Sequence, residues 1–98
     1  GGLRETCGAV TAMAAVIGLR KGPEAPMDPK TKAALYKDVQ AAVGDFDAAF
    51  GTHNCLELLR KASIHKRRGE APEARTADYY AKRPCAAFVR FCAERALR

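Results

Sequence analysis

Long apolar runs are missing from this sequence, and so is tryptophan. The longest weakly polar stretch extends only from Cys7 to Leu19, whereas a membrane-spanning helix needs about 20 consecutive apolar residues. Strand-like alternation of apolar and polar residues is also absent. Much of the 48% hydrophobic content is alanine, which favours helices and buries little area per residue. We therefore expect no transmembrane helix and a thin helical core.

Acidic residues are scarce: 11 Asp and Glu stand against 17 Lys and Arg, which gives a net charge of +6. The largest group of basic residues comprises Arg60, Lys61, Lys66, Arg67 and Arg68. Such a patch solubilises a loop or meets an acidic partner. Residues 58–70 contain no aromatic side chain that could stack on a base, and no nucleic-acid motif accompanies the charge. We do not expect nucleic-acid binding, and an interaction module with a basic loop is one hypothesis.

Two long helices are predicted in the first half of the chain. The first covers residues 6–19 and ends before the GPEAPMDP segment, because spaced prolines cannot continue a helix. Its apolar residues are Val10, Met13, Ala14 and Ile17. The second begins at Asp28 and Pro29 and stops at Gly51. Its apolar stripe consists of Leu35, Val39, Val43, Phe46 and Phe50.

Shorter helices are predicted in the second half. Asn54 caps a third helix, and Glu57 completes a pair that resembles a capping box. Residues 63–73 are charged and contain a glycine and a proline, so we expect a mobile excursion there. A fourth helix is predicted over residues 74–82, and Pro84 opens the last one. One face of the last helix carries Cys85, Phe88, Cys92 and Ala96, with Phe91 beside it. Residues 1–98 are thus expected to form one all-α domain, a small bundle of four to five helices.

The cysteines carry the most distinctive pattern. Cys7, Cys55 and Cys85 fall at predicted helix starts, where free N–H groups and the helix dipole favour a thiolate and lower its pKa. If these helix starts converge, any two of the three cysteines are candidates for a disulfide. Cys85 and Cys92 cannot bond to each other, because seven helical residues separate them by about 10 Å. Cys92 lies in mid-helix and is interpreted as a small apolar packing residue.

Metal binding uses the same thiols and is the alternative chemistry. Cys7, His53, Cys55 and Cys85 would make a tetrahedral set suited to zinc, or to iron. The sequence has no CxxC pair, and these ligands are scattered over the whole chain. His53 is therefore interpreted first as a polar residue of the turn before the third helix. No carboxylate pair, hydrolase triad or nucleotide-binding glycine pattern offers other chemistry.

Three features resemble the C_GCAxxG_C_C family of bacterial and archaeal proteins: GGLRETCGAVTAMAAVIGL, the later DFDAAFGTHNCLELL, and a cysteine before a terminal helix. In that family a glycine-rich stretch leads into Cys-Gly-Ala, and a Phe-Gly step precedes a cysteine followed by a Glu-Leu-Leu-like segment. A further cysteine lies near the C-terminus. Cys7, Cys55 and Cys85 match those positions. The resemblance covers nearly the whole chain and implies a small helical protein with a redox role attributed to its cysteines.

The chain departs from that family at two places. The family usually carries another cysteine on an upstream helix, which this sequence does not contain, and Ala12 stands where glycine is usual. The sequence also begins at Gly1 without a methionine or a secretory signal, which indicates a trimmed or processed product. Either the complete redox or metal site would then be absent, or a partner chain would complete it. A homodimer would be one way to cover the apolar surface left exposed.

The leading hypothesis is a cytoplasmic protein that cycles between thiol and disulfide at Cys7, Cys55 and Cys85. Cys55 is the expected attacking thiolate because its helix start is the best capped, and Cys85 or Cys7 would resolve the intermediate. This chemistry needs no cofactor, and its partner would be another redox protein. The sequence names neither a substrate nor an electron donor.

Overall fold

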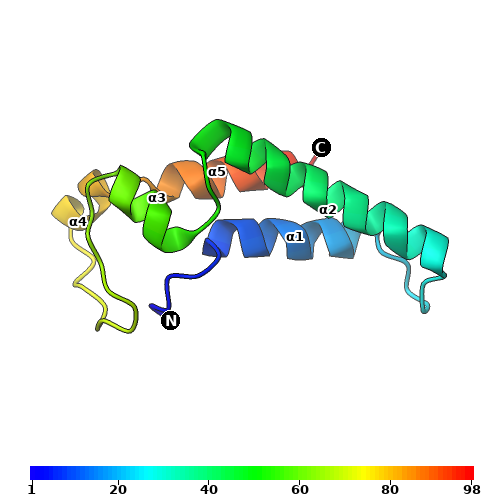
Figure 1. Ribbon diagram of the computed structural model, residues 1–98, viewed down its shortest axis with the longest axis horizontal. Helices are drawn as coiled ribbons and strands as arrows, with labels where there is room; N and C mark the ends of the chain where they lie inside the picture. The colour runs from blue at the N-terminus through cyan, green and yellow to red at the C-terminus, as the bar shows by residue number, and fades with distance from the viewer.

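The computed structural model describes all 98 residues, and its regular structure is entirely helical. Its elements are α1 (Gly8–Lys21), α2 (Pro29–Phe50), α3 (Cys55–Lys61), α4 (Ala77–Lys82) and α5 (Cys85–Ala96). α2 returns antiparallel to α1, and α5 lies against both, while α3 and α4 occupy the end of the molecule where α5 begins (Figure 1). The prediction of a small all-α bundle is confirmed. None of the five helices has the length and apolar composition needed to cross a membrane.

α2 begins and ends where its sequence signals predict. The Asp28 carboxylate accepts a hydrogen bond from the Thr31 N–H at 2.7 Å, and this bond lowers the pKa of the Asp28 carboxyl. Pro29 occupies the first turn, where its missing N–H costs nothing. Gly51 ends the helix at φ +89°, a conformation that favours glycine.

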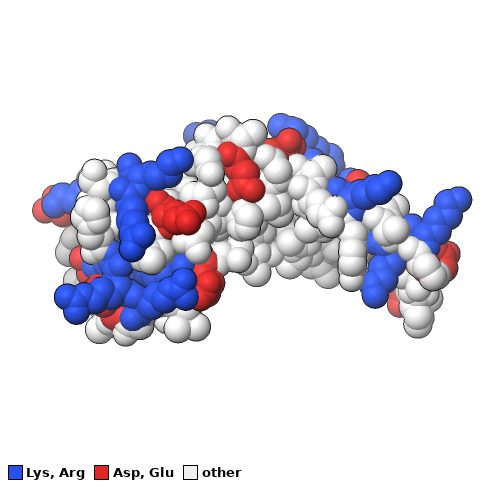
Figure 2. Space-filling model, viewed as in Figure 1, with Lys and Arg blue, Asp and Glu red and all other residues white.

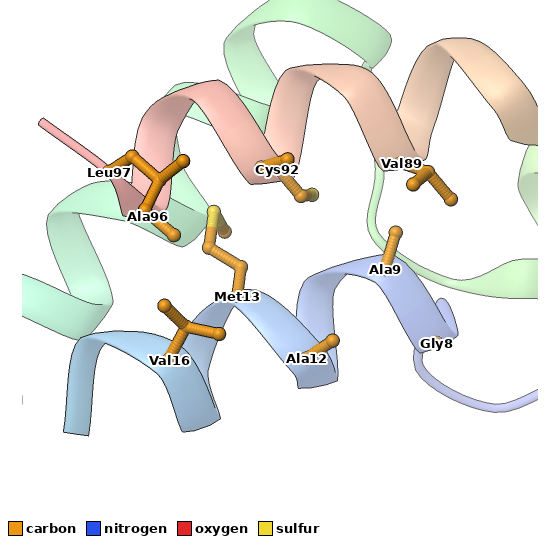
Figure 3. Close-up of a pocket in the computed structure, with 10 residues that line it drawn as sticks. Gly8, Ala9, Ala12, Met13, Val16, Val89, Cys92, Ala96 and Leu97 are labelled. Atoms are coloured by element: carbon orange, nitrogen blue, oxygen red, sulfur yellow. The ribbon is translucent and has the colours of Figure 1, made fainter. Parts of the chain in front are cut away.

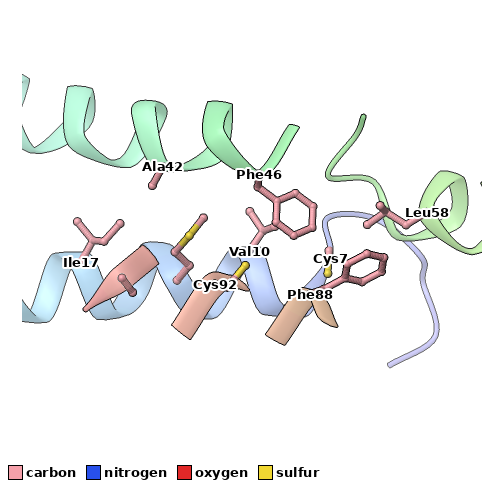
Figure 4. Packing of buried hydrophobic residues seen from close by; sticks show 10 residues of the cluster. Cys7, Val10, Ile17, Ala42, Phe46, Leu58, Phe88 and Cys92 are labelled. Carbon is pink, nitrogen blue, oxygen red and sulfur yellow. The ribbon is translucent and has the colours of Figure 1, made fainter. Parts of the chain in front are cut away.

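The core is thin and lies between the three longest helices. Phe46 of α2 is fully buried, and its ring lies 4.8 Å from that of Phe50, 5.7 Å from Phe88 and 5.8 Å from Phe91, measured between centroids. α1 contributes Val10, Met13 and Ile17 (Figure 4). The other residues of the predicted α2 stripe are only half-buried, whereas Ala42, outside that stripe, is fully buried.

The last helix corrects one expectation. Phe88, Cys92 and Ala96 are buried as predicted, but Cys85 is exposed. Cys85 is the first residue of α5, which follows Pro84, and the core begins one turn further along the helix. Its position therefore leaves the residue accessible at the end of the bundle.

The charged segment between α3 and α4 is irregular but contacts the rest of the molecule. The Gly69 N–H donates to the Gly2 carbonyl at 2.8 Å, and Arg68 pairs with Glu5. The Lys66 ammonium lies 3.1 Å from Glu73, and its side chain is only 14% exposed. Lys66, expected in a solvated basic patch, is thus a half-buried and paired cation.

Candidate functional site

An isolated antiparallel bridge joins the start of α1 to the start of α3. Thr6 and Asn54 face each other, the Cys7 N–H donates to the His53 carbonyl at 2.8 Å, and the Cys55 N–H donates to the Glu5 carbonyl at 2.6 Å. Side chains alternate between the two faces of such a pair. Cys7 and Cys55, each one residue beyond the bridge, therefore lie on the same face.

The bridge also fixes how far apart these two cysteines are. Cys7 lies opposite His53, so Cys55 is its diagonal neighbour, a relation that puts two residues roughly 7–8 Å apart. Disulfides need Cα atoms within about 7 Å. All four cysteines are free thiols in this structure. A disulfide between Cys7 and Cys55 would therefore require the two segments to approach each other.

Cys85 is electrostatically coupled to both of these cysteines. Partial desolvation raises the pKa of the Cys85 thiol even though the residue as a whole is exposed. The Arg83 charge opposes this shift, and the negative charges of Cys7 and Cys55 add to it. The charges of Cys7 and Cys55 thus reach the Cys85 thiol, although all four cysteines are free thiols. The predicted lowering of pKa at a helix start is wrong for Cys85, because desolvation and like charges outweigh the helix terminus.

The four thiols differ in accessibility. Cys7 is buried, Cys55 is half-buried, and Cys85 is exposed, so reagents can reach Cys55 and Cys85 most readily. Cys92 is only 3% exposed, and desolvation, followed by the charge of Cys7, raises its pKa to about 11. Cys92 therefore has the properties expected of a packing residue.

Arg4 belongs to this site, and the sequence analysis did not identify it. Its Nη1 donates to the Cys55 sulfur at 3.8 Å, while its Nε is buried without a partner. The Leu56 N–H donates to the Arg4 carbonyl at 3.3 Å, which extends the bridge and brings Arg4 beside the start of α3. Arg4 has φ +58°, a strained conformation for a residue with a side chain.

The turn before α3 positions Cys55 through a network of polar contacts. The Asn54 side chain accepts from the Glu57 N–H at 3.0 Å, as predicted. The second half of the capping box is different, because the Glu57 carboxylate accepts from the Thr52 hydroxyl at 2.6 Å, and that hydroxyl accepts from the Asn54 N–H at 3.1 Å. This network rigidly places the first residue of α3.

No three His, Cys, Asp or Glu side chains are arranged to hold a metal ion. The exposed His53 ring directs Nδ1 at Asp47, at 2.9 and 3.0 Å from the two carboxylate oxygens. The His53 imidazole is therefore directed at Asp47 and does not complete a metal site with Cys7, Cys55 and Cys85. Metal binding stays a prediction that needs a rearranged site.

The apolar groove between α1 and α5 is a separate feature. It has a volume of about 380 Å³ and is lined by α1 residues that include Ala12 and Val16 and by α5 residues that include Val89 and Cys92 (Figure 3). No charged side chain lines this groove. Because burial raises the pKa of the Cys92 thiol, that thiol is neutral at neutral pH. The groove therefore contains no charged or ionised group that could act in catalysis.

Comparison with known proteins identifies the family of this chain. Residues 1–98 match a family model described as "Putative redox-active protein (C_GCAxxG_C_C)". Neither the curated proteins nor the solved structures include a significant match. The match spans the whole sequence and confirms the resemblance carried by Cys7, Cys55 and Cys85. The chain belongs to the C_GCAxxG_C_C family.

Proposed function

We propose that this protein performs thiol–disulfide exchange with Cys55 as the attacking thiol. The observation that supports this proposal is the bridge between Thr6 and Asn54, which makes Cys7 and Cys55 diagonal neighbours on one face. The redox description of the family supports the general class of chemistry. In the cytoplasm, the compartment we propose, thiols are kept reduced, so the free cysteines correspond to the resting state.

The exchange has two balanced steps. The Cys55 thiolate attacks one sulfur of a substrate disulfide, the substrate S–S bond breaks, and one substrate thiolate leaves. A second cysteine thiolate then attacks the Cys55 sulfur, forms a bond within the protein and releases the other substrate thiolate. The substrate disulfide is reduced to two thiols, and two protein thiols are oxidised to one disulfide.

Cys55 suits the first step for two reasons. It is half-buried and so within reach of a substrate, and the Arg4 guanidinium next to its sulfur favours negative charge there. Cys7 suits the second step because it shares the face of Cys55 and is shielded from solvent. Cys85 is the other candidate for that step, since its charge is coupled to both.

The test is to treat the fully reduced protein with an excess of oxidised dithiothreitol or hydroxyethyl disulfide and to map the products by peptide mass spectrometry. We expect one internal disulfide that contains Cys55, and none in Cys55→Ser. The partner cysteine is the one whose serine variant stops at a mixed disulfide on Cys55. Cys92→Ala is the matched control and should behave like the unmodified protein. Four thiols that stay free in the unmodified protein, or a disulfide without Cys55, would reject the proposal.

Metal analysis of the same preparation, purified without chelator, tests the alternative. Stoichiometric zinc or iron, with Cys7, Cys55 and Cys85 protected from alkylation, would favour a metal-binding module. Metal-free protein with alkylated cysteines would favour exchange.

A further inference from the structure

A small basic pocket shares Arg4 with the surroundings of Cys55. It has a volume of about 260 Å³ and lies between the N-terminal segment, the irregular segment before α4, and Tyr79. Its charged lining consists of four cations and two carboxylates: Arg4, Lys66, Arg75, Arg83, Glu70 and Glu73. Figure 2 shows Lys and Arg side chains gathered at this end of the molecule, which carries α3 and α4. The pocket therefore carries an excess of positive charge.

The two carboxylates are already engaged with two of the cations. Glu73 accepts from Arg83 at 2.9 Å and lies 3.1 Å from Lys66. Hydrogen bonds from Arg83 and then Lys66 hold the pKa of the Glu73 carboxyl below its usual range, so it stays ionised. Glu70 lies 3.8 Å from the same Lys66. The two carboxylates thus neutralise charge on Lys66 and Arg83.

Arg4 and Arg75 have no carboxylate partner. The Arg75 guanidinium lies 4.4 Å from the centre of the Tyr79 ring, a contact that orients it and leaves its N–H groups available. The Arg4 Nε is buried without any partner, which is costly for a charged donor. Both guanidiniums line the pocket. An anion bound between them would satisfy both.

Arg4 connects this pocket to the reactive sulfur. Its guanidinium lines the pocket and also donates to the Cys55 sulfur at 3.8 Å. Its strained backbone conformation is held by the hydrogen bond from Leu56 to its carbonyl. A ligand held at Arg4 therefore lies within reach of Cys55.

We propose that this pocket binds the anionic end of the substrate, a small disulfide that carries carboxylates, with Arg4 and Arg75 holding one carboxylate while Cys55 attacks the disulfide. The inference rests on the proposed function of Cys55. Arginine suits this role because its planar fork matches a carboxylate in a bidentate arrangement. The exchange itself follows the two balanced steps given above.

The first experiment compares the rates at which Cys55 reacts with a dianionic and a neutral disulfide, 5,5′-dithiobis(2-nitrobenzoate) and 4,4′-dithiodipyridine. We expect Arg75→Gln to slow the anionic reagent about tenfold and to leave the neutral reagent nearly unchanged. Added salt should weaken the preference for the anion. Lys30→Gln, at the remote start of α2, is the matched loss of charge and should change neither rate. If the ratio of the two rates is unchanged in Arg75→Gln, the proposal that this pocket binds an anionic substrate is wrong.

A second experiment separates failure of the pocket from failure of the exchange chemistry. In Cys55→Ser, NMR titration with dithiodiglycolate should give saturable shifts around Arg75 and Tyr79, whereas its neutral dimethyl ester should not. If these shifts are absent while Cys55 still reacts in the unmodified protein, anion binding in the pocket is wrong. The proposed exchange function then still holds. Saturable shifts with a Cys55 that never exchanges support an anion site and overturn the proposed function.

A different observation points to self-association. The chain exposes 6816 Å², whereas a monomer of its 10.6 kDa mass exposes about 5500 Å². Its radius of gyration is 15.4 Å, against about 12.6 Å for a compact domain of this length. The excess of about 1300 Å² exceeds the roughly 800 Å² that each partner buries in a standard interface.

The apolar groove between α1 and α5 is part of this exposed surface. α1 carries no charged side chain from Gly8 to Leu19, although its buried residues lie on one side only. The uncovered side, with Ala12 and Val16, forms the groove together with Val89, which is 58% exposed. We infer that a second copy of this chain covers the groove, since one patch can pair with itself about a two-fold axis.

Sedimentation equilibrium over a wide range of protein concentration tests this inference. We expect a dimer of the unmodified protein and a monomer for Ala12→Glu, whose charge would have to enter the interface. Tyr80→Glu, at another exposed position, on α4, is the matched control and should remain dimeric. Helical content measured by circular dichroism checks that both variants fold. A monomer at every concentration of the unmodified protein overturns self-association, as does a dimer that survives Ala12→Glu unchanged.

Discussion

Replacing Phe46 with alanine is expected to lower the free energy of unfolding by about 3–5 kcal/mol. Phe46 is the largest fully buried side chain and contacts aromatic rings on both α2 and α5. The variant loses these ring contacts and leaves a cavity between the two helices. A domain of this size is stable by about 5–15 kcal/mol, so much of the total would be lost.

Urea unfolding followed by circular dichroism measures this loss. Tyr36→Ala is the matched control, because it removes an aromatic ring from the same helix at a position that is 55% exposed. The control should change the free energy of unfolding by less than about 1 kcal/mol. Phe46→Leu, which keeps most of the apolar volume, should fall between the two. Equal stability of Phe46→Ala and Tyr36→Ala would contradict the ring cluster as the centre of the core.

Local signals predicted the helices well because caps and stops act within a few residues. Asp28, Pro29 and Gly51 define α2 by hydrogen bonds and backbone conformations that need no distant partner. The buried residues were less predictable. A stripe spaced by three and four residues indicates which side of α2 faces inward, but Leu35 is only half-buried because α1 and α5 cover the other half of the helix more fully.

The sequence alone predicted that cysteines stand at helix starts, but it did not predict which residues surround them. Cysteine at a helix start is visible in the sequence, and Cys7 and Cys55 both stand there. The single bridge that joins them pairs one residue from each segment and leaves no alternating pattern. Arg4 enters the site through this non-local pairing, so no spacing in the sequence indicates its contact with Cys55.

The pKa of Cys85 is raised although this residue begins a helix, so position along a helix does not by itself determine a pKa. The helix terminus and Arg83 both favour the thiolate, but desolvation acts against it more strongly. The charges of Cys7 and Cys55 add to the penalty at Cys85, because like charges disfavour each other. The first position of a helix therefore does not give Cys85 a lowered pKa.

Raising the pH from 9 to 11 is expected to cost the folded protein about 2–3 kcal/mol through Cys92 alone. Burial raises the pKa of the Cys92 thiol from 9.0 to about 11. Below pH 9 the thiol is neutral in both the folded and the unfolded chain, so its full contribution is present. Between pH 9 and about 11 the unfolded chain releases the proton while the folded chain retains it, and stability falls.

Comparison of the unmodified protein with Cys92→Ala isolates this contribution. Every other ionisable group is present in both proteins, so effects shared by the two proteins cancel in the difference between their stability curves. Cys92→Ala should be less stable at neutral pH because of its cavity, and the gap should narrow steadily above pH 9. A gap that stays constant from neutral pH to pH 11 would show that Cys92 ionises without penalty. The thiol would then be accessible, and Cys92 would have to be added to the reactive cysteines instead of serving as the buried control among them.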